Sequence, residues 1–240
     1  DRGLALARDL GDSVAFRRVD VRREEDIAAL IALAVERFGR LDAMFNNAGL
    51  GGVGGPIAQT PTDGYDDTMA ILLRSVFLGI KHAAPVMVRQ GSGSIVSTAS
   101  VAGLQAGFGP HVYSAAKAGV IHLTRSVAME LGEQGVRVNC ICPGGIATPI
   151  FGGGMGLPPE AAQKTVPVMK MALAQMQPIR RAGLPEDIAQ AALYLCSDAS
   201  SFVNGHAMVV DGGLTGGRQW SQVLANRKAM RAALGLPDDN

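Results

Sequence analysis

Short apolar segments that alternate with amphipathic segments constrain the fold of this chain more than any other feature. Strands are predicted at residues 14–21, 41–45, 94–97, 136–142 and 207–210, and helices at residues 4–10, 24–38, 61–89, 111–131, 158–176 and 185–196. Strands and helices that alternate along a chain form a parallel sheet with helices on both faces. The sequence therefore predicts an α/β fold with a doubly wound parallel sheet.

Length and composition limit the domain organisation and the classes of partner. A chain of 240 residues with this pattern commonly forms one domain, so we expect a single domain over residues 1–240, with residues 215–240 as a helical tail. The formal net charge is +1, with acids and bases interspersed, and no apolar run approaches the roughly 18 residues of a membrane span. We therefore expect neither a nucleic-acid partner nor a membrane partner.

The cysteines and histidines do not form a recognisable metal or disulfide pattern. Cys140, Cys142 and Cys196 are too few for a disulfide framework, and a C-x-C pair lacks the four-ligand pattern of structural zinc sites. The four histidines are scattered along the chain. We therefore predict small core cysteines in a reducing compartment, the cytoplasm, and no metal site.

Tyr113, Lys117 and Ser100 are the candidate catalytic residues. The first two are four residues apart in a predicted helix, so their side chains share one face. A phenol has a pKa of about 10, and a neighbouring ammonium lowers it, which allows the phenol to exchange protons. Tyr113 and Lys117 alone would suggest a surface pair. Ser100, placed after a strand and before this helix, instead favours a catalytic group that holds a substrate oxygen.

These residues, with four further motifs, give the chain its resemblance to the short-chain dehydrogenase/reductase family, and the resemblance covers about residues 1–213. Each motif alone is weak, but together they follow the family's order. The motifs are D-V at Asp20 and Val21, N-N-A-G from Asn46 to Gly49, the Ser100, Tyr113 and Lys117 set, P-G at Pro143 and Gly144 with Thr148, and V-D-G-G from Val210 to Gly213. The family fold is Rossmann-like, with sheet order 3-2-1-4-5-6-7.

The resemblance implies hydride transfer between a nicotinamide cofactor and a secondary alcohol or ketone. Tyr113 would exchange the proton with the substrate oxygen, Lys117 would lower the pKa of Tyr113 and bind the nicotinamide ribose, and Ser100 would orient the substrate. The remaining cofactor-binding residues would be Asp20 and Val21 at the adenine, Asn47, Ala48 and Gly49 at the adenine ribose, and Pro143, Gly144, Ile146 and Thr148 at the nicotinamide carboxamide. The absence of an obvious arginine pair for a 2′-phosphate favours NAD, with NADP not excluded.

Two departures from the family pattern stand out. Leu72 occupies the position where the family usually has an asparagine that supports a water chain to the lysine, and leucine has no side-chain hydrogen-bonding group. The family's glycine fingerprint and first strand-helix-strand unit, which needs roughly 30 residues, are expected before Asp1. The G-x-G-x-x-G at residues 49–54 does not replace it, because no helix follows directly. We expect a triad rather than a tetrad, and a truncated sequence.

The sequence is also compatible with other functions. A catalytically silent nucleotide-binding paralogue would also explain Leu72, whereas a serine hydrolase would need a G-x-S-x-G turn around Ser100, which is absent. The G-P-H-V-Y-S-A-A-K segment resembles members that act on cyclic secondary alcohols. The resemblance also implies a homo-oligomer, a tetramer or dimer. Residues 151–159 are rich in glycine and proline, which predicts a flexible lid.

Overall fold

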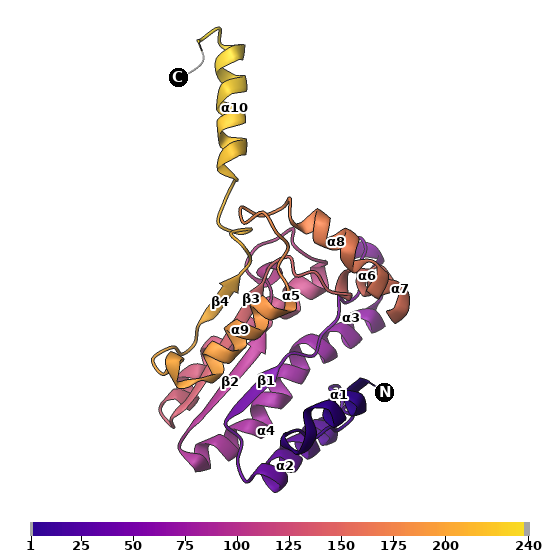
Figure 1. Cartoon of the computed structure of the whole chain (residues 1–240), viewed down its shortest axis with the longest axis vertical. Coiled ribbons are helices and arrows are strands. Elements are labelled where there is room, and N and C mark those ends of the chain that lie inside the picture. Colours follow the sequence, from indigo (N-terminus) through magenta and orange to yellow (C-terminus); the bar gives the residue numbers. More distant parts are fainter. Residues whose placement is uncertain (1, 238–240) are drawn as a thin grey trace.

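Four parallel strands form the sheet in the computed structural model, which describes residues 2–237. They are β1 (Ala43–Asn46), β2 (Gly93–Thr98), β3 (Val136–Pro143) and β4 (Ala207–Val210), and they lie side by side in the order β1-β2-β3-β4 (Figure 1). In register, Ala43 pairs with Ser94, and Ser94 pairs with Arg137. All strands therefore present their carboxyl ends at the same edge of the sheet.

Helices cover both faces of the sheet, as predicted. On one face, α4 (Ser75–Gln90) and α5 (His111–Gly132) pack against Ile95 and Val138, and α2 (Glu24–Phe38) adds to this core through α4. On the other face, α9 (Pro185–Cys196) packs against Val96 and Ile141. Neighbouring residues such as Ile95 and Val96 point to opposite faces, as the pleat of a strand requires. The α/β fold class is confirmed.

The strand predicted at residues 14–21 is wrong. This segment follows α1 (Arg2–Leu10) and a short turn, and it runs as coil. The Asp20 amide N–H donates to Asp26 Oδ2 at 3.0 Å rather than to a sheet partner. Among the described residues β1 is paired with β2 only, so no strand lies beside this segment to complete a ladder. Alternating polarity is not enough for a strand without a hydrogen-bonding neighbour.

The helix predicted at residues 61–89 is present but interrupted by a π-helical turn. It consists of α3 (Thr62–Met69), the turn Ala70–Arg74 and α4, and Pro85 lies inside α4 without ending it. Among the described residues, the helix Thr62–Gln90 is long and apolar enough to cross a membrane. Inside this structure, 44% of its most apolar window is buried. A core helix passes the same test, and α4 packs against β1 and β2.

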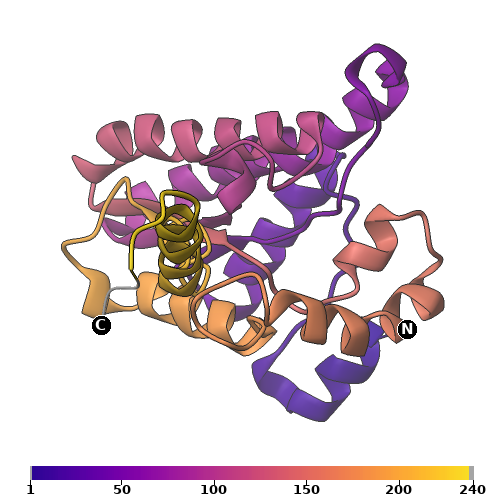
Figure 2. The same ribbon diagram turned by 90° about the horizontal axis from the view of Figure 1, so that it is seen from above.

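Three short helices lie beyond the carboxyl ends of the strands: α6 (Ile150–Gly154), α7 (Pro159–Lys164) and α8 (Val166–Leu173) (Figure 1). Pro167 lies in the first turn of α8, where a missing N–H costs no helical hydrogen bond. The segment predicted as a lid thus contains α6. Viewed from above, these helices lie on the same side of the molecule as α1 (Figure 2).

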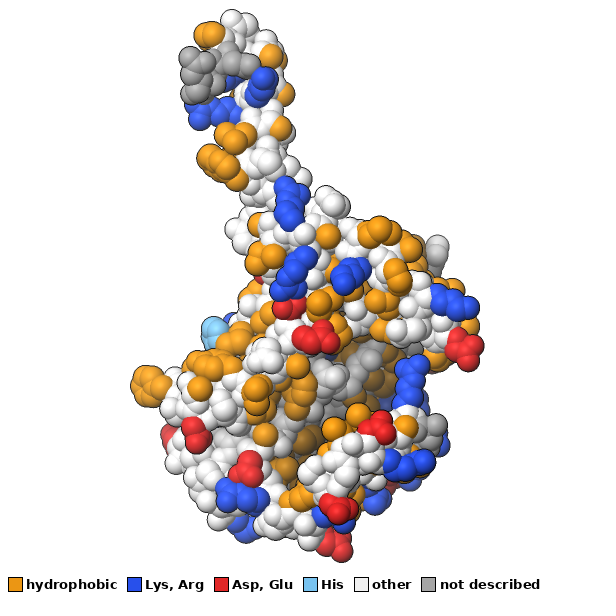
Figure 3. Space-filling view, in the orientation of Figure 1, with side chains coloured by type: hydrophobic (Ala, Val, Ile, Leu, Met, Phe, Trp, Pro, Cys, Tyr) orange, Lys and Arg blue, Asp and Glu red, His pale blue; other side chains and the backbone are white. Residues whose placement is uncertain are grey.

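The C-terminal helix α10 (Trp220–Ala233) extends away from the rest of the molecule (Figure 1). It buries none of its residues, and its surface mixes apolar and basic side chains (Figure 3). The helix predicted in the tail is therefore present. Cys140 and Cys142 are fully buried in β3, as predicted, while Cys196 is half-buried.

Candidate active site

Ser100, Tyr113 and Lys117 meet where β2 ends and α5 begins. Ser100 follows β2 and accepts a hydrogen bond from the Ala102 amide at 3.1 Å, which starts a short 3-10 turn. This turn packs directly on α5: a Cβ on Gly103 would lie 2.6 Å from the backbone carbon of Lys117. Only glycine allows this approach, so the turn holds Ser100 against the helix that carries the other two residues.

Tyr113 lies beside Ser100, and its phenol is largely removed from solvent. Burial raises the pKa of the Tyr113 phenol, and the hydrogen bond from Ser100 opposes this only in part. The expected net lowering of this pKa is not seen, because Lys117 Nζ lies 5.7 Å from the centre of the tyrosine ring and burial of the phenol outweighs the effect of its charge. The phenol is therefore kept protonated at neutral pH and is ready to donate a proton to an oxygen placed beside Ser100.

Lys117 is a buried cation, with 4% of its surface exposed. Its Nζ donates a hydrogen bond of 2.6 Å to the Thr98 carbonyl, at the end of β2. Burial lowers the pKa of Lys117 to about 8, and the neighbouring Cys142 and Cys140 thiols oppose this shift. An ammonium that loses its proton this close to neutral pH can take part in proton transfer, and such shifted groups concentrate at active sites.

Leu72 lies behind Lys117, in the π-helical turn, and is 1% exposed. A Cβ on Gly49 would lie 3.4 Å from Leu72 Cδ2 and 4.0 Å from Lys117 Nζ. The leucine methyl and the lysine ammonium therefore face the same glycine. At this point the wall of the site is apolar, because leucine offers no group that could bind a water molecule.

The N-N-A-G segment follows β1 and is joined to the end of β2 by two side-chain hydrogen bonds. Asn46 Nδ2 donates to Ser97 Oγ at 3.3 Å, and Thr98 Oγ1 donates to Asn47 Oδ1 at 2.8 Å. Asn47, Ala48 and Gly49 themselves are exposed at the carboxyl edge of the sheet. Their backbone is accessible next to Lys117, which suits the approach of a bound molecule.

The segment after β3 is fixed on both sides. The Gly144 amide donates to the Val210 carbonyl at 3.0 Å, and the Ala147 amide donates to the Gly183 carbonyl at 2.8 Å. Pro143, Gly144, Ile146 and Thr148 are half-buried. This segment lies along the same sheet edge as Ser100 and Asn47, since β3 is the neighbour of β2.

Asp20 and Val21 belong to the coil before α2, and ion pairs hold this coil. Arg22 contacts Asp20 at 2.8 Å and Asp67 of α3 at 2.9 Å. The hydrogen bonds from Arg22 lower the pKa of Asp20 to about 2. Arg74 of the π-helical turn donates a 2.6 Å hydrogen bond to the Arg22 carbonyl. The carboxylate is thus ionised and oriented, although it is exposed.

The comparisons with known proteins agree with this geometry. A family model described as Enoyl-(Acyl carrier protein) reductase matches residues 1–215. Momilactone A synthase from Oryza sativa subsp. japonica is 40% identical over 89% of this chain and 77% of its own length. (+)-Borneol dehydrogenase 2 from Salvia officinalis is 38% identical over 93% of this chain and 80% of its own length. The chain belongs to the short-chain dehydrogenase/reductase family. As a member, it is an NAD(P)-dependent oxidoreductase that acts on CH–OH groups.

Two solved structures of the family share the fold. A 7α-hydroxysteroid dehydrogenase complexed with NADH and 7-oxo glycochenodeoxycholic acid has a TM-score of 0.71 and 35% identity, over 82% of this chain and 72% of its own. ElxO with NADP bound has a TM-score of 0.75 and 27% identity, over 85% of this chain and 79% of its own. Each of the two was solved with a nicotinamide cofactor, and the two cofactors differ, so the likeness leaves NAD and NADP equally supported.

Three features of this short-chain dehydrogenase/reductase were not found from the sequence. They are the acceptor role of the Thr98 carbonyl, the π-helical turn around Leu72 and the two ion pairs of Arg22. The sequence carries no signal for the first two, because both depend on packing between distant segments. Among residues 2–237 no group of three or more His, Cys, Asp or Glu side chains could hold a metal ion.

Proposed function

We propose that the chain transfers a hydride between NAD and a cyclic secondary alcohol or its ketone, with Ser100, Tyr113 and Lys117 as catalytic residues. The observation that carries this proposal is the placement of Tyr113 beside Ser100, with the buried Lys117 one helical turn further along α5. A group that must donate a proton to a carbonyl oxygen as hydride arrives has to lie beside that oxygen.

The residues present at the sheet edge fit a nicotinamide cofactor. The absence of a side chain at Gly49 leaves space beside Lys117 Nζ that a Cβ would fill. We assign Asp20 and Val21 to the adenine, Asn47, Ala48 and Gly49 to the adenine ribose, Lys117 to the nicotinamide ribose, and Pro143, Gly144, Ile146 and Thr148 to the carboxamide. When bound, the cofactor supplies or accepts the hydride.

The chain's own residues handle the proton. In ketone reduction the Ser100 hydroxyl donates a hydrogen bond to the carbonyl oxygen and fixes its position. The carbonyl carbon gains the hydride, and the oxygen gains the Tyr113 proton, which leaves a phenolate. Lys117, whose pKa is lowered to about 8 by burial, stabilises that phenolate as an ammonium. Alcohol oxidation runs through the same positions in reverse.

The substrate class rests on the relatives. The Salvia relative is named for borneol, and the 7α-hydroxysteroid dehydrogenase was solved with a 7-oxo bile acid. Both names indicate a ring carbon as the reacting centre, which supports a cyclic alcohol or ketone here.

We further propose that residues 1–240 form one domain, that the protein is a homotetramer or homodimer, and that it is located in the cytoplasm. Light scattering would measure the mass of the oligomer, and fractionation of cells that express a tagged protein would test the location.

The test is turnover of cyclohexanone with NADH, followed by absorbance, in the wild-type protein and in Tyr113→Phe. General acid-base groups typically contribute about 10²–10⁴-fold, so turnover should fall by that factor while NADH binding, measured by titration, survives. Tyr194→Phe, on the half-exposed Tyr194 of α9, is the matched control. Near-normal turnover in Tyr113→Phe would remove the assignment.

A second function, a silent nucleotide-binding paralogue, is favoured by one observation, the buried Leu72 behind Lys117. The same assay separates the two functions. A silent paralogue would bind NADH or NADPH and show no turnover with cyclohexanone or with larger cyclic ketones in either direction. The presence of Ser100, Tyr113 and Lys117 together at the end of β2 argues for the enzyme.

A further inference from the structure

The coil that carries Asp20 is a compact turn built around Arg22. The Arg22 amide donates to Asp20 Oδ1 at 3.0 Å, and its guanidinium donates to both oxygens of the same carboxylate at distances from 2.8 to 3.2 Å. The Arg23 amide closes the turn by donating to the Asp20 carbonyl at 2.9 Å. Aspartate side chains that bond the backbone two residues on are typical of such turns. A contact that fixes Arg22 therefore also fixes the Asp20 carboxylate.

Two contacts reach this turn from one helical segment that is distant in the sequence. Asp67 of α3 accepts a hydrogen bond from Arg22 Nη1 at 2.9 Å, and Arg74 Nη1 of the π-helical turn donates to the Arg22 carbonyl at 2.6 Å. The paired residues are 45 and 52 positions apart. One contact holds the side chain of Arg22, and the other holds its main chain. Exposed charged groups contribute little singly and more as a network, and here the network acts on one turn.

The π-helical turn that carries Arg74 is attached to the catalytic end of the site. Leu73 packs on α5, because a Cβ on Gly119 would lie 2.9 Å from Leu73 Cδ2. Leu72 is buried behind Lys117. Turns of this kind within α-helices are frequent at functional sites. Arg74 therefore joins the coil at the adenine end to an element that packs on the catalytic helix α5.

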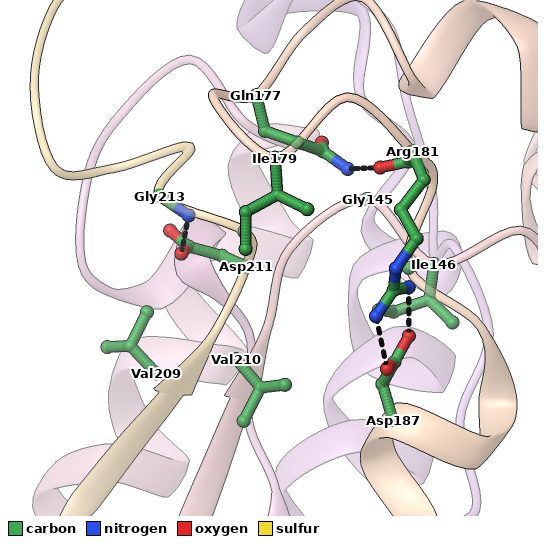
Figure 4. A pocket seen from close by; sticks show the side chains of 12 residues that line it. Gly145, Ile146, Gln177, Ile179, Arg181, Asp187, Val209, Val210, Asp211 and Gly213 are labelled. Carbon is green, nitrogen blue, oxygen red and sulfur yellow. Dashed lines mark hydrogen bonds and ion pairs between the residues drawn. The ribbon is translucent and has the colours of Figure 1, made fainter.

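A second arginine–aspartate pair shows a local version of the same contact. Arg181 donates two parallel hydrogen bonds of 2.6 and 2.7 Å to Asp187, six residues further on (Figure 4). Asp187 also accepts a hydrogen bond from the Leu184 amide at 2.8 Å, at the start of α9. This pair holds its own turn and helix end together. The contacts from Asp67 and Arg74 instead join distant segments, so they position one wall of a site relative to another.

We propose that Arg74 and Asp67 are positioning residues for cofactor binding, which hold the Asp20 turn where it can bind the adenine half. This inference rests on the proposed assignment of Asp20 to the adenine. The Asp20 side chain is 37% exposed, so a ligand can reach it. Arg74 and Asp67 act on the ligand only through Arg22. Without their contacts the turn is held by local bonds alone, so the adenine half binds more weakly while proton transfer at the catalytic end is unchanged.

The experiment is a calorimetric titration of the full chain with ADP-ribose, which is the adenine half of the cofactor without the nicotinamide. In Arg74→Met its affinity should fall roughly two- to fivefold, the lower range for one hydrogen bond because this one is exposed. Arg74→Lys keeps a donor and should recover part of the loss. Arg89→Met removes another exposed arginine, near the end of α4, and should bind like the wild type.

Two readouts separate positioning from a general loss of stability. In the reductase assay Arg74→Met should raise the KM for NADH by a similar factor and leave kcat unchanged. In an Asp20→Ala background, Arg74→Met should cause no further loss of ADP-ribose affinity, because the carboxylate that it positions is gone. Asp67→Asn should behave in the same way with a smaller loss. Circular dichroism checks that all variants are folded.

Unchanged ADP-ribose affinity in a folded Arg74→Met variant would overturn the inference and leave the proposed function standing. An equal loss in the wild-type and Asp20→Ala backgrounds would also overturn it, because Arg74 would then act on the fold and not through Asp20. A wild type that reduces cyclohexanone with NADH but binds ADP-ribose no better than Asp20→Ala would remove the adenine assignment, and the inference with it. A wild type that binds neither NADH nor ADP-ribose would remove the proposed function as well.

Discussion

The two ends of the proposed cofactor site are built in different ways. At the catalytic end, Ser100 and Lys117 are buried, and they are held by β2 and α5, which pack in the main core. At the adenine end, Asp20 lies in a coil and is held by Arg22, and both side chains are substantially exposed. Burial fixes the first end, whereas surface ion pairs fix the second.

This difference determines which forces can tune each end. A buried ammonium such as Lys117 carries a large desolvation cost, so small changes around it shift its protonation. An exposed ion pair such as Arg22–Asp20 is weakened by water and salt, so on its own it contributes little to holding the coil. We therefore expect large and pH-dependent effects from changes at the catalytic end, and small and salt-dependent effects at the adenine end.

Lys117→Met should give the largest change in stability and should make it depend on pH. Below pH 8 the wild-type lysine is charged in both the folded and unfolded states, and the fold bears the desolvation cost. Between pH 8 and 10.5 the folded protein loses the proton before the unfolded chain does, so wild-type stability rises with pH. The gain over this interval should be about 3 kcal/mol, and Lys117→Met should lack it.

The measurement is urea unfolding of both proteins at several pH values. The methionine leaves the Thr98 carbonyl without its donor, but that loss does not vary with pH, so the slope is the informative quantity. Lys164→Met, on the exposed Lys164 of α7, controls for the loss of an ammonium at the surface. Parallel stability curves for wild type and Lys117→Met would mean that Lys117 is well solvated in solution.

The sequence predicted the elements whose ends carry local signals. Glu24–Phe38 was predicted with correct bounds because three acids occupy its first turn and Gly39, with φ of 78°, ends it in the left-handed region. The bounds predicted for the strand Ala207–Val210 were also correct. The strand predicted at residues 14–21 is absent, because a strand needs a hydrogen-bonding neighbour and the local sequence pattern does not show whether one is there. The π-helical turn Ala70–Arg74 likewise has no local signal in its residues.

For the site, the sequence predicted which residues meet but not their protonation. The spacing of Tyr113 and Lys117 correctly placed both on the same helix, and Ser100 lies beside them. The shift of the Tyr113 pKa was predicted downward and is upward here, because burial outweighs a lysine that points to Thr98. Burial depends on how distant segments pack, so it cannot be read from spacing.

Leu72→Asn tests whether an apolar wall behind Lys117 limits proton exchange. The new amide would offer hydrogen bonds next to the ammonium, so turnover should rise or the pH optimum should move. Stability should fall by about 1–3 kcal/mol, because Leu72 is fully buried and an amide there is hard to satisfy. The measurements are the pH-rate profile and urea unfolding.

Leu72→Met is the matched control, because it keeps an apolar side chain of similar size and should leave the pH-rate profile unchanged. If the profile of a folded Leu72→Asn variant matched that of the wild type, proton exchange at Lys117 would not depend on this wall. The catalytic end would then be less sensitive to its surroundings than its burial suggests.

Arg22→Met should have the smallest effect and should appear in cofactor binding alone. It removes the contacts to Asp20 and Asp67, so the KM for NADH should rise only roughly two- to fivefold, with kcat unchanged, because exposed ion pairs contribute little. The difference from wild type should shrink in high salt. Arg23→Met, whose arginine pairs with Glu25 instead, is the control. A kcat loss comparable with that of Tyr113→Phe would contradict the comparison, because it would show that these surface pairs also position the buried catalytic end.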